Sequence, residues 1–183
     1  MNITDGKGAY VFPGLAEMHA HLPAATDGNT QLQEETLWLY LTNGVLRIRS
    51  MLGHESHLAL KKNVVTGEVP GPRMFISGPS LNGTSVESPQ MGAQMVGSQK
   101  AVGYDHLKLH PGLDTPKFLA IAETAKAVGI PYGGHVSLEV GLVNCLENGY
   151  KSVEHMDGYL EAMIADNSRL DPTIAGPFSM LVV

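Results

Sequence analysis

Two histidines separated by one residue, His19 and His21, end an apolar run that begins at Val11. The run is typical of a β-strand, in which side chains alternate between two faces with a period of two. Both imidazoles are therefore expected to point the same way, where they could bind one metal ion. For an isolated pair, one buried, hydrogen-bonded histidine beside an exposed one is an equally good interpretation.

Composition limits the classes of partner. The chain has 183 residues, of which 43% are hydrophobic, and its mean hydropathy is -0.01, which is typical of one globular domain with a proper core. A net charge of -6 predicts no nucleic-acid partner, and no run approaches the roughly 18 apolar residues of a membrane span. We expect a small-molecule partner; composition leaves the oligomeric state open.

The single cysteine, Cys145, excludes an internal disulfide framework. It lies in a mostly apolar, helical stretch without neighbours that would lower its pKa, so we interpret it as a core residue rather than a nucleophile. The chain has no secretory signal, but a further segment could precede Met1. Both a cytoplasmic and a periplasmic location therefore stay open.

Helical and strand-like segments alternate along the chain. Five of the predicted helices end at a glycine, where a left-handed residue can close the last turn. Two helices are expected to begin at Ser88-Pro89 and Thr115-Pro116, each with an N-cap followed by proline. The predicted helices are 30–43, 56–66, 88–103, 115–129, 138–148 and 158–165, and the strands after the first are 45–49, 73–77, 104–110, 130–135 and 151–155.

Such alternation predicts an α/β protein with a parallel sheet. The first strand is not followed by a glycine-rich phosphate loop, which disfavours a nucleotide-binding doubly wound sheet and favours a (β/α)8 TIM-type barrel. Functional residues of such a barrel come from the C-terminal ends of its strands.

Three more basic residues lie at such strand ends. Lys108, His135 and His155 lie at the ends of the predicted fourth, fifth and sixth strands, in line with the two histidines of the first. His110 shares a face with Lys108, and contact with substrate or a hydrogen bond within the loop would both explain it. His54 and His57 lie elsewhere and are expected to be solvated or helix-capping.

At this point the chain resembles a family. Residues 12–21 resemble the P-G-L-x-D-x-H-x-H signature of the metal-dependent amidohydrolase superfamily. Five later segments are similar to its imidazolonepropionase-like and Xaa-Pro-dipeptidase-like branch; they are Leu41–Val45, Gly71–Arg73, Gly103–Lys108, Gly134–Val136 and Val153–His155. One departure follows Arg49, where Ser50 replaces the acid usual in that branch.

The resemblance implies a hydrolase of amide or peptide-like C–N bonds that uses a hydroxide bridging two divalent ions, by default zinc. It places His19 and His21 on one ion and His135 and His155 on the other. Lys108 would bridge the ions as a carbamate formed with carbon dioxide. Without the resemblance, Lys108 would be expected to pair with Asp105 or to reach solvent.

A complete barrel takes about 250 residues, whereas this chain shows six strands. We therefore expect a fragment: residues 1–183 form a partial barrel domain, and residues 1–10 are a remnant of the family's flanking β-sandwich. The family's catalytic aspartate at the eighth strand is expected outside the chain, so Asp157 and Asp171 receive no catalytic role. The fragment alone is expected to be inactive.

Two alternatives remain open, one within the resemblance and one on the residues alone. One is a mononuclear deaminase of the same superfamily, in which Lys108 is not carboxylated. The other is an inactive remnant that keeps the imidazole cluster and binds metal without turnover.

Overall fold

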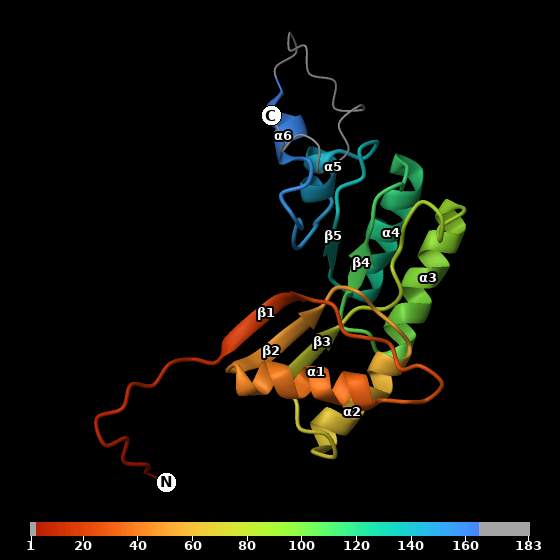
Figure 1. Cartoon of the computed structure of the whole chain (residues 1–183). Coiled ribbons are helices and arrows are strands. Elements are labelled where there is room, and N and C mark those ends of the chain that lie inside the picture. The colour runs from red at the N-terminus through yellow and green to blue at the C-terminus, as the bar shows by residue number, and fades with distance from the viewer. Residues whose placement is uncertain (1–2, 165–183) are drawn as a thin grey trace.

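The computed structural model describes residues 3–164, in which strands and helices alternate as the sequence predicts (Figure 1). The strands are β1 (Leu15–Ala20), β2 (Val45–Ser50), β3 (Arg73–Ile76), β4 (Leu107–Leu109) and β5 (Tyr132–Gly134). The helices are α1 (Gln31–Thr42), α2 (Ser56–Thr66), α3 (Pro89–Val102), α4 (Thr115–Val128), α5 (Leu142–Glu147) and α6 (Tyr159–Met163). Asp171 lies outside the described residues.

The strands form two short parallel sheets, one with the order β1-β2-β3 and one that pairs β4 with β5. Isolated bridges between Ser77 and His106 and between Leu81 and Leu109 connect the β3 side to the β4 side. The predicted sixth strand is reduced to one bridge, between Gly134 and Val153. Residues 3–164 thus form an α/β arrangement of two sheets and not a closed barrel.

Local signals placed the C-terminal ends of the helices well, whereas the helix predicted from residue 138 begins at Leu142. The glycines predicted to close helices all have a positive φ, between 66° and 99°; they are Gly44, Gly67, Gly103, Gly129 and Gly149. The Ser88 hydroxyl accepts a hydrogen bond from the Met91 amide at 3.2 Å, which confirms this N-cap. At the next helix the prediction was off by one residue, because Asp114 and not Thr115 is the N-cap.

Each sheet has its own core. Leu37 of α1 and Leu60 of α2 pack on Ile48 and Ile76 of the first sheet. The second core contains Phe118 and Ile121 of α4, Leu107 and Leu109 of β4, and Cys145 of α5. Burial raises the pKa of the Cys145 thiol to about 11, as expected for a core cysteine. The two halves are therefore separately packed bodies, with α1 and α2 beside one sheet and α3 and α4 beside the other (Figure 1).

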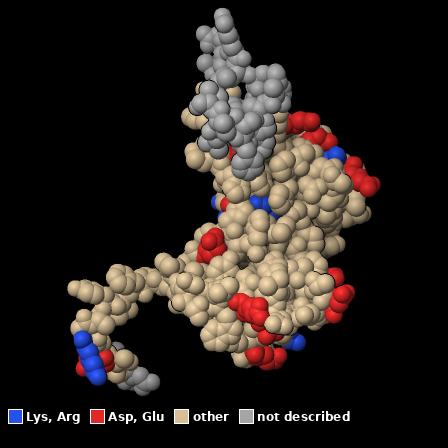
Figure 2. Space-filling view, viewed as in Figure 1, with Lys and Arg blue, Asp and Glu red and all other residues tan. Residues whose placement is uncertain are grey.

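The charges on the outer surface agree with the net charge of -6, which predicted no nucleic-acid partner. On the face shown in Figure 2, lysines and arginines form no continuous patch, and acidic side chains lie in separate groups around both halves. No helix among residues 3–164 is both long and apolar enough to cross a membrane.

His57 is fully buried at the start of α2. Of its two expected roles the solvated one was therefore wrong, whereas its ring does hydrogen-bond the backbone at the start of a helix. Its Nε2 lies 3.0 Å from the Pro23 carbonyl oxygen, and its Nδ1 accepts a hydrogen bond from the His54 amide at 3.2 Å. This arrangement requires the neutral imidazole, and burial lowers the pKa of His57. The histidine thus fixes the loop that follows β1.

We predict that His57 makes stability depend on pH. Because its pKa is lower in the folded chain than the unfolded value of about 6.5, its stabilising effect is complete above pH 6.5 and is lost as the pH falls towards the folded pKa. A His57→Gln variant should be about 1–3 kcal/mol less stable at pH 7.5, because it leaves buried polar groups unpaired. Urea unfolding at pH 7.5 and 5.5 should show a smaller loss of stability on acidification than in the parent chain, and an equal loss would contradict this role.

Candidate active site

The histidines predicted to lie at strand ends come together in the structure. The ring centroids of His19 and His21 are 5.1 Å apart, those of His19 and His155 are 4.7 Å apart, and those of His135 and His155 are 5.1 Å apart. His110 stacks on His135 with centroids 4.9 Å apart and an interplanar angle of 25°. Imidazoles from distant parts of the chain thus form one cluster that spans both sheets.

Lys108 is the central residue of β4 and is fully buried. Its Nζ has no hydrogen-bond partner among the described residues, and burial lowers the pKa of the amine to about 8. Asp105 instead pairs with Lys61 at 2.6 Å. The interpretation of Lys108 as a strand lysine paired with Asp105 or exposed to solvent is therefore wrong.

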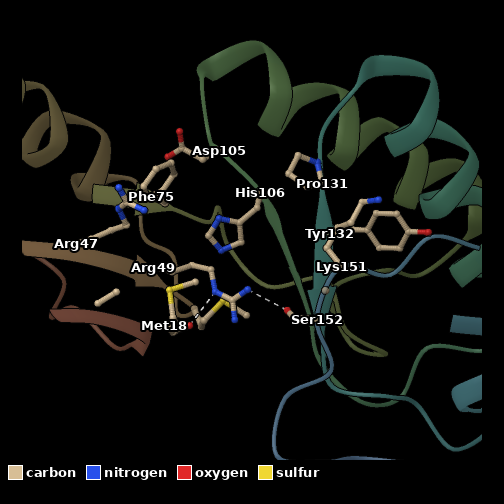
Figure 3. A pocket seen from close by; sticks show the side chains of 13 residues that line it. Met18, Arg47, Arg49, Phe75, Asp105, His106, Pro131, Tyr132, Lys151 and Ser152 are labelled. Carbon is tan, nitrogen blue, oxygen red and sulfur yellow. Dashed lines mark hydrogen bonds between the residues drawn. The ribbon is translucent and has the colours of Figure 1, made fainter. Parts of the chain in front are cut away.

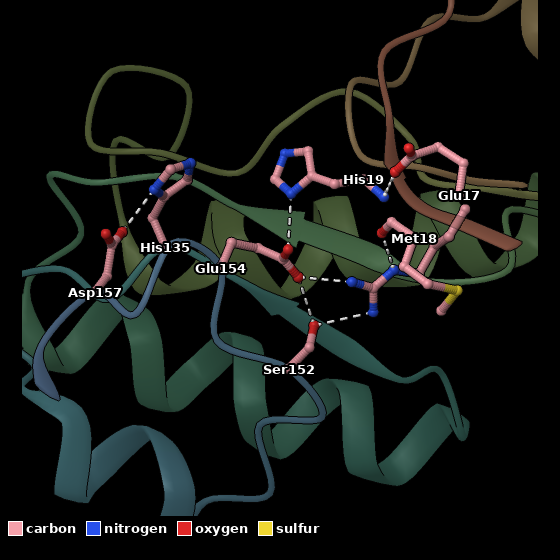
Figure 4. A network of polar contacts seen from close by, with 8 residues as sticks. Glu17, Met18, His19, His135, Ser152, Glu154 and Asp157 are labelled. Carbon is pink, nitrogen blue, oxygen red and sulfur yellow. Dashed lines mark hydrogen bonds and ion pairs between the residues drawn. The ribbon is translucent and has the colours of Figure 1, made fainter.

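His19 is oriented by a carboxylate that the sequence did not single out. Its Nδ1 lies 2.7 Å from Oε2 of Glu154, a residue of the segment after β5 (Figure 4). Burial alone would raise the pKa of Glu154, but hydrogen bonds from Ser152 and His19, with the charge of Arg49, hold it below its ordinary value. An ionised Glu154 can only accept, so His19 donates from Nδ1 and keeps the lone pair of Nε2.

His135 has an equivalent partner in Asp157. Its Nδ1 lies 2.6 Å from Oδ2 of Asp157, whose side chain is only 3% exposed (Figure 4). The hydroxyl of Tyr150 donates to the His135 carbonyl oxygen at 2.8 Å. Burial lowers the pKa of His135 more than the Asp157 hydrogen bond raises it. Asp157 thus holds the ring of His135, and Tyr150 holds its backbone.

Glu154 and Asp157 are the first and last residues of one tight turn. The Asp157 amide donates to the Glu154 carbonyl oxygen at 3.0 Å, and the two residues between them, His155 and Met156, have φ angles of 56° and 59°. Positive φ at both central positions is typical of a type I′ turn and is strained for residues other than glycine, asparagine and aspartate. The strained turn places Glu154 beside His19, Asp157 beside His135, and His155 between them. Carboxylates one residue before and two residues after His155 were the signal that sequence reasoning missed.

The electrostatics favour neutral imidazoles. Burial and the neighbouring His19 and Lys108 lower the pKa of His21, and burial lowers that of His110 to about 4. A neutral imidazole keeps a nitrogen lone pair, which is the form that binds metals. At neutral pH the cluster can therefore offer donors to a cation.

The donor chemistry fits a divalent ion. Imidazole nitrogens with carboxylates behind them are the usual environment of a protein-bound zinc. The Nζ of Lys108, which no described residue hydrogen-bonds, lies close enough to lower the pKa of His21 and His135. The spacing is looser than a coordination shell, because no group of three or more His, Cys, Asp or Glu in residues 3–164 could hold a metal as it stands.

Comparisons with known proteins give structural neighbours only. No family model and no curated protein matches the chain. Among solved structures, bottromycin amidohydrolase is 25% identical, with a TM-score of 0.69 over 88% of this chain and 35% of its own. A Xaa-Pro dipeptidase (17% identity, TM-score 0.67) and A. niger ochratoxinase (16%, 0.67) are each matched over 77% of this chain and 47% and 46% of their own.

The predicted resemblance is thereby confirmed: the structural neighbours of this chain are amidohydrolases, with a Xaa-Pro dipeptidase among them. The chain spans about a third to a half of the length of these neighbours.

We predict that Lys108 destabilises the fold. Its buried ammonium has no partner among the described residues, so a Lys108→Met variant of similar shape should be about 1–4 kcal/mol more stable in urea unfolding at pH 7. A matched Lys62→Met change on α2, at an exposed lysine, should alter stability by less than about 0.5 kcal/mol. A Lys108→Met variant less stable than the parent would show that the amine supports the fold.

Proposed function

We propose that this chain carries the metal-binding part of an amidohydrolase that cleaves amide or peptide-like C–N bonds. One observation carries the proposal: four imidazoles, from His19, His21, His135 and His155, lie together beside the buried amine of Lys108. This amine has no hydrogen-bond partner among residues 3–164. A lysine of this kind costs stability, and function explains its presence better than folding does. The amidohydrolase neighbours support the same reaction class.

In this proposal His19 and His21 hold one divalent ion, by default zinc, and His135 and His155 hold a second. Bound ions of this kind polarise a carbonyl group and lower the pKa of water, which prepares an amide for hydrolysis. Glu154 and Asp157 keep His19 and His135 in the tautomer whose Nε2 is free to bind, and they raise the basicity of both rings.

Lys108 is proposed to join the two halves of the site as a carbamate. The lowered pKa of its amine increases the uncharged fraction, whose lone pair attacks carbon dioxide. A new N–C bond forms, one C=O π bond becomes a carboxylate, and the nitrogen releases a proton. The product is an anion with two oxygen donors, which removes the cost of a buried cation and adds ligands.

The neighbours suggest the substrate class and the whole fold. One neighbour is named as a Xaa-Pro dipeptidase and another as a prolidase solved with N-methylphosphonate-L-proline. We propose a small amide or short peptide as substrate. We also propose that the two parallel sheets belong to a (β/α)8 barrel, of which residues 3–164 provide the strands and the strand-end segments that carry the metal ligands.

Zinc binding tests the proposal. Equilibrium dialysis of the chain against Zn²⁺ with bicarbonate should give about two ions per chain, and a His19→Asn or His135→Asn variant should lose at least one of them. His54→Asn is the matched control, because His54 hydrogen-bonds to Ser56 in the loop before α2 and lies outside the cluster. Zinc binding that is absent, or equally weakened by His54→Asn, would contradict the proposal.

A further inference from the structure

Backbone hydrogen bonds join the two sheets on one side. The Asp105 amide donates to the Ile76 carbonyl oxygen at 2.9 Å, and the Leu81 amide donates to the Lys108 carbonyl oxygen at 3.0 Å. These contacts lead from β3 to β4. On the other side, β1 and the segment 151–154 belong to different sheets, and side chains make the connection between them (Figure 4).

Arg49 of β2 makes this connection with all three of its guanidinium nitrogens. Its Nε donates to the Met18 carbonyl oxygen at 2.8 Å, Nη1 donates to the Ser152 hydroxyl at 3.0 Å, and Nη2 donates to Oε1 of Glu154 at 2.7 Å. Met18 directly precedes His19 in β1, and Glu154 holds the ring of the same histidine. One side chain thus hydrogen-bonds to the first sheet beside His19 and to the segment of the second sheet beside His155.

The hydrogen bonds of Arg49 are important because the side chain borders a pocket between the two sheets. A pocket of about 310 Å³ separates the two sheets here, with Met18 and Phe75 on one side and Tyr132 on the other (Figure 3). Close-packed side chains would fix the distance between sheets by contact alone, but a pocket leaves its walls without partner atoms. The separation of the sheets at this point must therefore depend on polar contacts that cross the gap.

We propose that Arg49 is a positioning residue, which fixes the separation of the two sheets and so sets the spacing between the His19–His21 pair and the His135–His155 pair. Its consequence for metal binding rests on the function proposed above. Only arginine suits the task, because its guanidinium is planar, always charged and able to donate in three directions. A lysine ammonium at this place would reach one of the three acceptors on a flexible stem.

Arg47 provides the matched control. It lies two residues before Arg49 on the same strand and lines the same pocket, but it packs over the Phe75 ring at 5.9 Å and makes no ion pair with a described carboxylate. Removing either arginine takes a positive charge and a similar volume from the pocket. Only the loss of Arg49 should release the second sheet.

The experiment measures the separation of the sheets directly. Spin labels are attached at Glu35→Cys on α1 and Glu123→Cys on α4, which are exposed positions beside different sheets, while the native Cys145 is buried and unreactive. Double electron–electron resonance without added metal should give a longer or broader distance distribution in Arg49→Met and an unchanged one in Arg47→Met. In the same proteins Arg49→Met should weaken zinc binding roughly tenfold to a hundredfold, and Arg47→Met should not.

The outcomes separate the two proposals. An unchanged distribution in Arg49→Met, or an equal change in Arg47→Met, would overturn the role of Arg49 whatever the zinc result. A parent chain that binds no zinc but shows the Arg49-specific change would overturn the proposed function and leave the positioning role standing. If Arg49→Met does not fold, Arg49→Lys replaces it and should also broaden the distribution; a parent-like distribution in Arg49→Lys would contradict the proposal.

Discussion

The carboxylate of Glu154 is the point on which the site depends. Its side chain is 10% exposed, and an anion with so little water must find its partners inside the protein. It finds them in Ser152 of its own segment and in two residues of the other sheet, His19 and Arg49. Removing either of the last two would leave a buried charge short of a partner. The requirement to satisfy this one anion draws the two sheets together where the histidines lie.

The strained turn at His155 follows from the same requirement. A relaxed extended chain would carry Asp157 away from Glu154, and His135 would then lose the partner that sets its tautomer. Left-handed backbone at His155 and Met156 turns the chain within four residues, so that one short segment serves both ends of the cluster. Its cost is offset by two charge-assisted contacts, at 2.7 Å and 2.6 Å. Strain, a buried amine and lowered imidazole pKa values thus occur together, which is typical of functional sites.

Sequence alone predicted the features that local chemistry decides. Helix ends were predictable because glycine in a left-handed conformation and a proline after an N-cap act within one turn, as at Gly103 and Ser88. Residues 151–155 look like a strand by composition, but they pair at one bridge, because the Glu154–Asp157 turn ends the extended conformation. His57 was misjudged since its burial depends on the Pro23 carbonyl oxygen, 34 residues earlier in the chain. Such long-range contacts leave no periodic signal.

The candidate site shows the same division. Their positions at the C-terminal ends of parallel strands predicted that His19, His21, Lys108, His135 and His155 would meet. The structure places the four histidines in one cluster that spans both sheets. The contacts that orient them were not predictable, because Arg49 and Glu154 are 105 residues apart and belong to different sheets. In the sequence, Arg49 is distinguished only by the resemblance, as the residue before Ser50, which replaces the usual acid. Two of its three acceptors, Ser152 and Glu154, belong to the second sheet, and no local pattern predicts that they lie beside Arg49.

We propose that the four clustered histidines and Lys108 form one binuclear site. A crystal structure of the chain grown with zinc and bicarbonate, with anomalous data at the zinc edge, tests it most directly. We predict two zinc peaks roughly 3.5–4 Å apart, with imidazole nitrogens of His19, His21, His135 and His155 at about 2.0–2.1 Å and carbamate density on Lys108 Nζ. Zinc bound elsewhere, for example at His54, with a bare Lys108 amine would contradict the claim.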